Sequence, residues 1–375
     1  MKVLFAGGGT AGHINPALAV AGYLRELEPD VQILYIGAKG GMEERLVPAA
    51  GYEFRSITVS GFQRKLSWKN VRRNAAAVVR VFTASREARK IIREFKPDIC
   101  VGTGGYVAGP VIREAIKLKI PAVIHEQNAF PGVTNKVLSK KADRTMLAVS
   151  DAQRYLPDEA HCVVTGNPVR QEVIRAKRAE ARKKLGLDDR PLILSFGGSL
   201  GARKINEAVA DLLVQSVKTG RFQHIHGYGQ WGRWFPELMK KKGIDLSAHP
   251  ELDVREYISN MPDCLAAADL VICRAGAITL SEIQAQGKAS ILIPSPNVAE
   301  NHQYHNAMAL VDRGAAAILE EKDLTGQSLC KKVEELFTDP KTIPALGERA
   351  RKMAILDANR RIAKVIREVL AERAV

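Results

Sequence analysis

The sequence predicts an α/β protein with two doubly wound domains, each holding a parallel sheet between layers of helices. Short apolar runs of strand length alternate with longer helical patterns along the 375-residue chain, as in parallel sheets that are covered on both faces. The alternation starts twice, at "FAGGGTAGH" (residues 5–13) and at "SFGGSLGAR" (195–203). Each start joins a strand to a glycine-rich loop and a helix, which indicates two similar halves of the chain.

In the first half, an apolar run at residues 3–6 predicts the opening strand. A helix is expected at 16–27, with Asn15 as its N-cap and Pro16 in its first position. Later strands of this half are expected at 32–36, 99–101, 122–124, 145–149 and 162–164. Glycine and proline then punctuate "TGNPVR" (165–170), which predicts the link between the halves.

The second half repeats the pattern from a strand at residues 191–196. Further strands are expected around Ile225 and at 254–257, 270–273, 291–293 and 317–319. The last segment predicts one long basic helix, which we expect to pack back toward the first domain. These patterns predict domains at 1–164 and 165–348 and a final helix at 349–375. Because ligands of doubly wound sheets bind at the carboxyl ends of the strands, both glycine loops are expected to face a cleft between the domains.

The composition limits which binding partners and which cellular compartment are expected. The formal net charge of +15 either meets an anionic partner, such as nucleic acid, a membrane or a phosphorylated substrate, or is carried as solvated surface. The five cysteines include no C-x-x-C pair, which argues against a disulfide framework or a zinc site and favours a reducing compartment. With no signal peptide and no apolar stretch of about 18 residues, a cytosolic protein is expected, which is compatible with attachment to a membrane surface.

The first glycine loop, "GGGTAGHINP" (residues 7–16), matches two nucleotide-binding patterns incompletely. A G-x-G-x-x-G dinucleotide loop requires an acid at the end of the second strand, but that strand ends in Gly37. A P-loop requires Lys-Ser/Thr where His13 and Ile14 stand. A nicotinamide or flavin enzyme and a P-loop enzyme are therefore both disfavoured.

The same loop still offers a site for an oxygen-rich or anionic group. The backbone N–H groups of Thr10, Ala11 and Gly12 are expected at a helix N-terminus, where such groups bind. The helix dipole disfavours imidazolium at His13, so a neutral imidazole that can accept a proton is expected there. The alternative is a histidine that only caps the loop.

Seven motifs in order resemble those of a known family. The chain closely resembles the bacterial N-acetylglucosaminyltransferases that make lipid II, from Met1 to the final helix. The resemblance implies the two-Rossmann-domain (GT-B) glycosyltransferase fold. It also implies inverting transfer of N-acetylglucosamine from the UDP-sugar to the muramyl C4 hydroxyl of lipid I. The motifs are "GGGTAGHINPALAVA" (7–21), "GTGGYVAGP" (102–110), "HEQNAFPG" (125–132), "TGNPVR" (165–170), "SFGGSLGAR" (195–203), "CRAGAITLSEIQAQGKASILIP" (273–294) and "ENHQYHNA" (300–307).

The resemblance also implies roles for individual residues. His13 is implied as the catalytic base, and Glu282 as the acid that binds the ribose. The backbone of Ile258 is implied to bind the uracil edge, and Arg170 and Ser199 are implied to contact the donor. The N–H groups at 198–201 offer a physical means for that contact. The residues implied in donor or substrate binding are Thr10, Ala11, Gly12, Asn128, Arg170, Ser199, Ile258, Ala277, Ile278, Thr279, Leu280, Ser281, Glu282 and Gln303, and those implied at the acceptor are Tyr106, His125 and Glu126.

Simpler interpretations remain open for several of these residues. A carboxylate near a helix start, such as Glu282, is often only a partner of the helix dipole. His125 and Glu126 could form a buried hydrogen-bonded pair at a strand end. Tyr304 stands where some family members carry a second glutamine after the one that matches Gln303, which puts a second amide contact in doubt.

No metal or other cofactor is expected. His302 and His305 have helical spacing but no evident third ligand, so we interpret them as structural. The chain contains no Asp-x-Asp, the sequence that holds the metal in many glycosyltransferases of the other major fold.

Residues 61–93 are strongly basic, with Glu87 as the only acid and with Phe62, Leu66 and Trp68 interleaved. This composition favours shallow binding to an anionic bilayer, where the lipid-linked acceptor lies. The alternatives are a solvated helix face and, less favoured because aromatic residues are only 6% of the chain, nucleic-acid binding. The basic residues are Arg64, Lys65, Lys69, Arg72, Arg73, Arg80, Arg86, Arg89, Lys90 and Arg93.

The sequence thus predicts a peripheral enzyme on the cytoplasmic face of the cell membrane. Its first domain would take lipid I and its second UDP-N-acetylglucosamine, with other cell-wall proteins as further partners and no nucleic acid. One alternative is a related UDP-sugar enzyme with another acceptor, or an epimerase. The other is a basic nucleotide- or nucleic-acid-binding protein without turnover.

Overall fold

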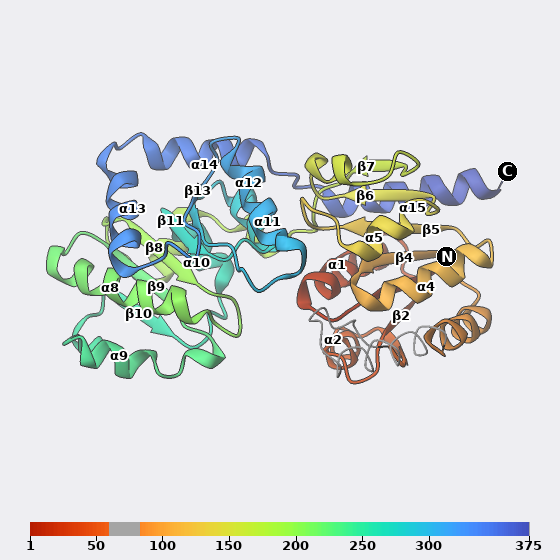
Figure 1. The fold of residues 1–375 in the computed structure, drawn as a ribbon, viewed down its shortest axis with the longest axis horizontal. Coiled ribbons are helices and arrows are strands. Elements are labelled where there is room, and N and C mark those ends of the chain that lie inside the picture. The colour runs from red at the N-terminus through yellow and green to blue at the C-terminus, as the bar shows by residue number, and fades with distance from the viewer. Residues whose placement is uncertain (60–82, 375) are drawn as a thin grey trace. The chain divides into compact units, whose positions relative to one another are not determined.

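The computed structural model describes residues 1–59 and 83–374. The chain forms two compact units, one of residues 1–168 together with 357–375 and one of residues 169–356. Each unit is built on its own parallel sheet with helices around it (Figure 1). The predicted α/β class with two doubly wound sheets is therefore confirmed. The boundaries expected at 164 and 348 lie a few residues before those of the compact units.

The sheet of the first unit has the order β3-β2-β1-β4-β5-β6-β7. β1 lies between β2 and β4, so that Phe5 pairs with Tyr35 on one side and with Val101 on the other. The edge strand β3 was not expected, because its sequence EFRSI is mostly charged or polar. The strands are β1 (Lys2–Gly7), β2 (Gln32–Ala38), β3 (Glu53–Ile57), β4 (Ile99–Gly104), β5 (Ala122–Glu126), β6 (Arg144–Leu147) and β7 (Cys162–Val164).

Helices cover both faces of this sheet because alternate residues of β1 point in opposite directions. Val3 and Phe5 pack among apolar residues of α1 and α15. Leu4 and Ala6 pack among those of α4 and of the helical residues 83–95. The helices are α1 (Ala11–Leu27), α2 (Glu43–Ala49), α4 (Gly105–Lys117), α5 (Val133–Leu138), the 3-10 helix η1 (Ser150–Tyr155) and α15 (Ala358–Ala374).

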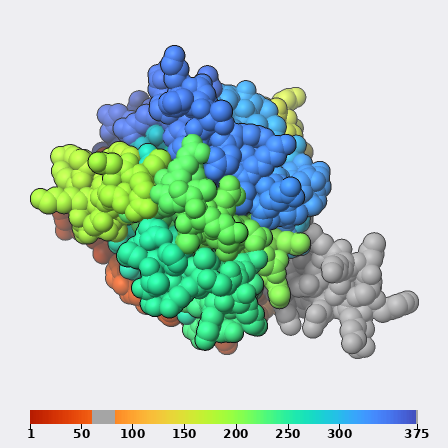
Figure 2. Space-filling view, turned by 90° about the vertical axis from the view of Figure 1, so that its left-hand side faces the viewer, coloured from red at the N-terminus to blue at the C-terminus, as the bar shows by residue number. Residues whose placement is uncertain are grey.

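The second unit has a sheet of order β10-β9-β8-β11-β12-β13. Helices α8 and α13 pack side by side, and their green and blue surfaces adjoin in the space-filling view (Figure 2). The strands are β8 (Leu192–Phe196), β9 (Gln223–Gly227), β10 (Leu252–Arg255), β11 (Leu270–Cys273), β12 (Ala289–Leu292) and β13 (Ala317–Ile318). The helices are α6 (Gln171–Arg175), α7 (Arg178–Lys184), α8 (Arg203–Thr219), η2 (Gln230–Gly232), α9 (Phe235–Lys241), η3 (Leu246–Ala248), α10 (Met261–Ala267), α11 (Ala277–Gln286), η4 (Ala299–Asn301), α12 (His302–Val311), α13 (Gly326–Thr338) and α14 (Thr342–Lys352).

Two helix predictions were wrong. The first helix begins at Ala11, directly after the glycine loop, and Pro16 lies inside it. Because proline has no N–H, the helix lacks the backbone hydrogen bond from residue 16 to the Gly12 carbonyl. The expected final helix at 349–375 is two helices, α14 and α15, which belong to different units. The chain leaves helical geometry before Asp357, whose carboxylate accepts from Arg360 and Arg361 in the first turn of α15.

Side-chain pairs fix α15 on the first unit. Arg367 binds Glu28 at 2.9 Å, and Glu372 binds Arg144 at 2.5 Å. Within the described parts of the chain, no helix has the length and apolar character that crossing a bilayer requires.

Candidate active site

The first glycine loop follows β1 and leads directly into α1, so the N–H groups of the first helical turn emerge at the carboxyl end of the sheet. Gly7 and Gly8 are buried, whereas Thr10, Ala11 and Gly12 are exposed. A second glycine turn packs against this loop: a Cβ at Gly105 would lie 2.2 Å from the carbonyl oxygen of Gly8. The loop thus has a rigid inner side and an outer side of exposed backbone donors, as a site for an oxygen-rich group requires.

His13 is half-buried, and its ring orientation is fixed by its Nδ1 atom. Nδ1 lies 3.1 Å from the carbonyl oxygen of Gly8 and 3.1 Å from the Oγ1 atom of Thr10. Because a carbonyl can only accept, Nδ1 must carry the proton, and the lone pair is then on Nε2. The hydroxyl of Thr103 donates to the His13 carbonyl oxygen at 2.7 Å and ties this turn of α1 to β4. The local geometry therefore sets the tautomer in which Nε2 can take a proton.

Glu43 lies directly behind this loop and was missed in the sequence. It is the first residue of α2 and is completely buried. Its Oε1 atom accepts from the Ala38 N–H at 2.9 Å, and its Oε2 atom accepts from the Gly9 N–H at 3.3 Å. The dinucleotide-loop pattern places an acid at the end of β2. The acid that reaches the loop instead comes back to it from the following helix.

Tyr106 borders the same loop from α4, as its motif suggested. A Cβ at Gly9, whose φ is +84°, would lie 2.8 Å from the Tyr106 ring, so the ring packs on the glycine. The side chain is at the surface, with a relative exposure of 36%. Burial of part of the ring, and secondarily the Glu43 carboxylate, raises the pKa of Tyr106 above its usual value, so its hydroxyl stays a neutral donor.

His125 and Glu126 lie at the end of β5, and both are only 2% exposed. The His125 Nε2 atom lies 2.9 Å from the Gly166 carbonyl oxygen, and burial lowers the pKa of this imidazole. Glu126 accepts from the side chains of Asn128 at 3.0 Å and Asn135 at 2.8 Å, and from the Gly132 N–H at 3.0 Å. These contacts fit the structural alternative, in which the pair shapes the loop that carries Asn128. A direct role at the acceptor stays a prediction.

The second glycine loop, residues 197–201, follows β8. The Gly201 N–H donates to the Gly198 carbonyl at 2.9 Å, and Ser199 accepts from the Gln230 N–H at 3.1 Å. This turn places the start of α8 at Arg203, after the loop has closed. Of the N–H donors expected at 198–201, that of Gly201 is therefore used inside the loop and is not available to a ligand. Gly198 and Ser199 remain exposed.

Arg170 and Glu282 belong to different sequence motifs and form an ion pair. The Arg170 Nε atom lies 2.8 Å from the Glu282 Oε1 atom. The Glu282 side chain is 10% exposed and that of Arg170 is 50% exposed. Glu282 is carried by α11, whose first residues are Ala277, Ile278 and Thr279. The pair orients the carboxylate from one side, and the Arg170 side chain as a whole stays half exposed.

Three further features of the second unit concern predicted residues. The Gln303 Oε1 atom accepts from the Ser295 N–H at 2.9 Å, which joins the start of α12 to the loop after β12. Ile258 is buried, with 5% exposure. Ser281 turns back on its own helix and donates to the Ala277 carbonyl at 3.1 Å.

The sequence also missed the support of the loop that precedes α11. Arg274 pairs with Glu321 and donates to the carbonyl oxygens of Ile293 and Pro294. Its position inside "CRAGAITLSE" was the available signal, but its partners are distant in sequence. Among the residues that the structure describes, no three His, Cys, Asp or Glu side chains gather as metal ligands. The His302 Nδ1 atom bonds the Ala299 carbonyl oxygen at 2.8 Å.

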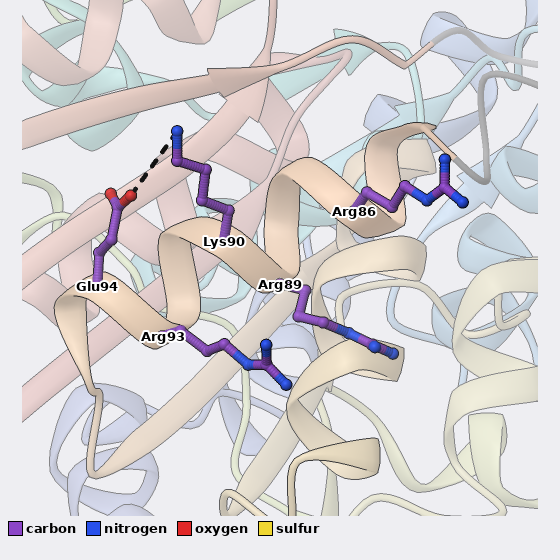
Figure 3. Close-up of a pocket in the computed structure, with 5 residues that line it drawn as sticks. All are labelled: Arg86, Arg89, Lys90, Arg93 and Glu94. Carbon is purple, nitrogen blue, oxygen red and sulfur yellow. Dashed lines mark ion pairs between the residues drawn. The ribbon is translucent and has the colours of Figure 1, made fainter.

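Part of the predicted basic segment forms one face of the helical residues 83–95. Arg86, Arg89, Lys90 and Arg93, with Glu94, line an open pocket of about 340 Å³, and their side chains extend from a single helix (Figure 3). The opposite face packs in the core through Ala84, Ala88, Ile91 and Ile92. The other expected residues of this segment lie outside the described residues: Phe62, Arg64, Lys65, Leu66, Trp68, Lys69, Arg72, Arg73 and Arg80.

Two parallel-sheet units, with glycine-rich loops at the carboxyl ends of their strands, are the architecture of two-domain glycosyltransferases. The models of the N-terminal and C-terminal domains of glycosyltransferase family 28 match residues 3–147 and 192–366. The UDP-N-acetylglucosamine--N-acetylmuramyl-(pentapeptide) pyrophosphoryl-undecaprenol N-acetylglucosamine transferase of Acetivibrio thermocellus is 46% identical over 375 residues, which is 100% of both chains. The Bacillus cereus transferase 1 of the same name is 41% identical and covers 99% of this chain and 100% of its own. This chain belongs to that transferase family.

Solved structures agree with this assignment. The crystal structure of Acinetobacter baumannii MurG has a TM-score of 0.78 at 30% identity and covers 98% of this chain and 99% of its own. The UDP-GlcNAc 2-epimerase of Neisseria meningitidis shares the fold, with a TM-score of 0.65 at 14% identity, covering 99% of this chain and 100% of its own. The chain is thus a glycosyltransferase, and the alternative of a binding protein without turnover is excluded.

Proposed function

We propose that this protein transfers N-acetylglucosamine from UDP-N-acetylglucosamine to the muramyl C4 hydroxyl of lipid I, with inversion at the anomeric carbon, and so forms lipid II. The donor and acceptor are those in the name of relatives that are 41–46% identical along the whole chain. The structural observation that carries the chemistry is the first glycine loop, where His13 Nδ1 donates to the Gly8 carbonyl oxygen, so that the lone pair of the neutral ring is on Nε2.

The reaction needs a base, an oriented sugar and a stabilised leaving group. In the proposed step, His13 Nε2 takes the proton of the acceptor's C4 hydroxyl. The oxygen of that hydroxyl forms the new bond to the anomeric carbon. The bond from that carbon to the UDP oxygen breaks, and UDP leaves with the electron pair. The N–H groups of Thr10, Ala11 and Gly12 and the amide of Asn128 hold the transferred sugar or the acceptor beside the base. Tyr106, on the rim of the loop, is a further acceptor contact.

The second unit is proposed to hold the UDP portion. The N–H groups of Gly198 and Ser199, and those at the start of α11, suit the diphosphate. Glu282 accepts from the ribose hydroxyls while Arg170 holds its other side, as their 2.8 Å pair supports. The backbone at Ile258 binds the uracil edge. Gln303, whose Oε1 atom is held by Ser295, donates through its amide nitrogen to a sugar hydroxyl.

The basic face of the helical residues 83–95 supports attachment to an anionic membrane surface. Its apolar side is used in the core, and Arg86, Lys90 and Arg93 are exposed on the other side. Exposed cations suit an electrostatic contact with lipid headgroups. The enzyme would then work as a peripheral protein on the cytoplasmic face, where it meets its lipid-linked acceptor.

The deciding experiment measures UDP release from UDP-N-acetylglucosamine with and without lipid I. We expect release only when lipid I is present, with formation of a disaccharide-lipid product. Release that does not depend on acceptor would indicate an epimerase or hydrolase, and release with a different acceptor would indicate another transferase. Either result would refute the proposal.

A further inference from the structure

Glu43 has no part in the proposed chemistry, and its environment is unusual for a carboxylate. Among the described residues, no Lys, Arg or His pairs with it, although it is 0% exposed. A buried charge without a cationic partner is costly. Three glycines make room for the group: a Cβ at Gly8, Gly37 or Gly41 would lie 2.1, 2.4 or 2.6 Å from atoms of the Glu43 side chain. The surrounding backbone is thus built to hold this carboxylate.

Each oxygen of the carboxylate accepts from a backbone N–H group, and one of these N–H groups belongs to the first glycine loop. Oε1 accepts from the Ala38 N–H at 2.9 Å, at the end of β2. Oε2 accepts from the Gly9 N–H at 3.3 Å. This N–H is one end of the peptide group that joins Gly8 to Gly9. Its other end, the Gly8 carbonyl oxygen, lies 3.1 Å from His13 Nδ1.

A single peptide group therefore connects the buried carboxylate to the imidazole. Hydrogen bonds in such a chain polarise one another, so the negative charge on Glu43 makes the Gly8 oxygen a stronger acceptor. A stronger acceptor at Nδ1 stabilises the protonated ring and keeps the neutral ring in the tautomer with its lone pair on Nε2. Glu43 acts in this way without touching the substrate.

We propose that Glu43 is a positioning residue that orients His13 and raises its basicity through the Gly8–Gly9 peptide group. The proposal rests on the proposed function only in so far as His13 is the base. The coupling itself is a property of the free protein and can be measured without turnover.

Other groups that face the loop do not supply this effect in the described structure. Tyr35, from β2, donates to the Gly7 carbonyl at 3.1 Å, and burial raises its pKa. Tyr106, from α4, also has a raised pKa. Both phenols are therefore neutral near pH 7. Asn135, from α5, lies beside Gly104 and carries no charge, and the Glu126 carboxylate behind it is bound by amides of its own loop.

The test measures the titration of His13 by ¹⁵N NMR of histidine-labelled protein, with its signals assigned from a His13→Gln spectrum. Wild-type protein should show Nδ1 protonated in the neutral ring. In Glu43→Gln, we expect the midpoint of the His13 titration to fall by about half a pH unit, because the stabilising negative charge is lost. Glu43→Asp keeps the charge on a shorter side chain and should give a smaller fall, so the series remains informative if the glutamine variant is poorly folded.

Glu114→Gln is the matched control. Glu114 is also a buried carboxylate of the first unit, 1% exposed, but it pairs with Arg89 and Lys117 away from the loop. Its loss should lower stability without moving the His13 midpoint. An unchanged midpoint in Glu43→Gln, or an equal shift in Glu114→Gln, would overturn the proposal.

The pH profile of kcat separates this proposal from the proposed function. If His13 is the base, the acidic limb of kcat should move to lower pH in Glu43→Gln together with the NMR midpoint. A midpoint that moves while the limb stays in place supports the coupling and refutes His13 as the base. A limb that moves while the midpoint stays in place refutes the coupling.

Discussion

The two glycine loops follow equivalent strands, yet they differ in what lies around them. In the first unit, α1 begins at Ala11 within the loop and carries His13, and the buried carboxylate of Glu43 binds the loop from behind. In the second unit, the loop closes on itself through the Gly201 N–H before α8 begins at Arg203. The first loop holds an imidazole in a defined tautomer, whereas the second offers backbone N–H groups and the hydroxyl of the exposed Ser199. This difference supports the proposal that the first loop carries proton transfer and the second unit binds the donor.

His13 also differs from two histidines of the second unit, His224 and His226. His13 is half-buried at the end of a loop. His224 and His226 are buried inside β9, where they bond Ser216 at 2.6 Å and Ser195 at 2.8 Å. Burial lowers the pKa of each of these two to about 3, so they remain neutral at any pH at which the enzyme works. These two histidines are thus part of the core of the second unit.

The largest effect is expected from removing the proposed base. His13→Gln should reduce kcat by about 10²- to 10⁴-fold, the usual contribution of a general base. The KM for UDP-N-acetylglucosamine should change by less than about threefold, because the UDP portion is assigned to the second unit. Steady-state kinetics with saturating lipid I would measure both constants.

His161→Gln is the control for that experiment, because His161 is exposed in the segment before β7. It should leave kcat near the wild-type value. If His13→Gln instead raises the donor KM strongly while kcat at saturation survives, His13 is a binding residue and the contrast between the loops is lost.

The next effect concerns donor binding in the second unit. Glu282→Gln should raise the KM for UDP-N-acetylglucosamine by about 30-fold, since a lost charged hydrogen bond is worth about 2 kcal/mol, while kcat falls much less. Arg170→Met, which removes the partner at 2.8 Å, should give a smaller change in the same direction. Binding of UDP alone, measured by calorimetry, should weaken in parallel. Unchanged UDP affinity in Glu282→Gln would limit this carboxylate to a structural role on α11.

A third effect is the pH dependence of the free energy of unfolding, to which the buried His224 and His226 should contribute and His13 should not. The pKa values of His224 and His226 are about 3 in the folded protein and about 6.5 in an unfolded chain. The unfolded chain therefore binds more protons between these values, and the stabilisation present above pH 6.5 is lost as the pH falls toward 3. At pH 5 this amounts to about 2 kcal/mol for each histidine.

Urea unfolding at pH 7 and pH 5 would measure this loss, with Trp231 and Trp234 as fluorescence probes in the second unit. In His226→Gln, part of the pH dependence should disappear even if the variant is less stable at pH 7. His13→Gln should leave the pH dependence of this transition unchanged. If His226→Gln shows the full wild-type dependence, the buried imidazole is not the group that titrates.

The sequence predicted features that depend on neighbouring residues, and missed those that depend on distant ones. Alternating apolar runs located most strands, and the glycines with His13 located the first loop. Pro16 misplaced the start of α1, since the proline rule describes a preference that a loop packed against β4 can override. Glu43 was missed because its contact with Gly9 spans 34 positions. Arg170 and Glu282 were each suggested by motifs, but nothing local showed that residues 112 positions apart would pair.

The smallest effect is expected on binding to anionic membranes. It tests whether the first unit alone makes the membrane contact. Arg86→Gln with Arg93→Gln should weaken binding to anionic vesicles by about tenfold, because each cation near the surface contributes up to about 1 kcal/mol. Arg89 is kept because it pairs with the buried Glu114 at 2.6 Å. Cosedimentation with phosphatidylglycerol vesicles at low salt measures the effect, and turnover of a water-soluble acceptor should be unchanged. The matched control is Lys240→Gln with Lys241→Gln at the end of α9 in the second unit. Equal losses in both double variants would mean that net charge, and not this helix face, drives the attachment.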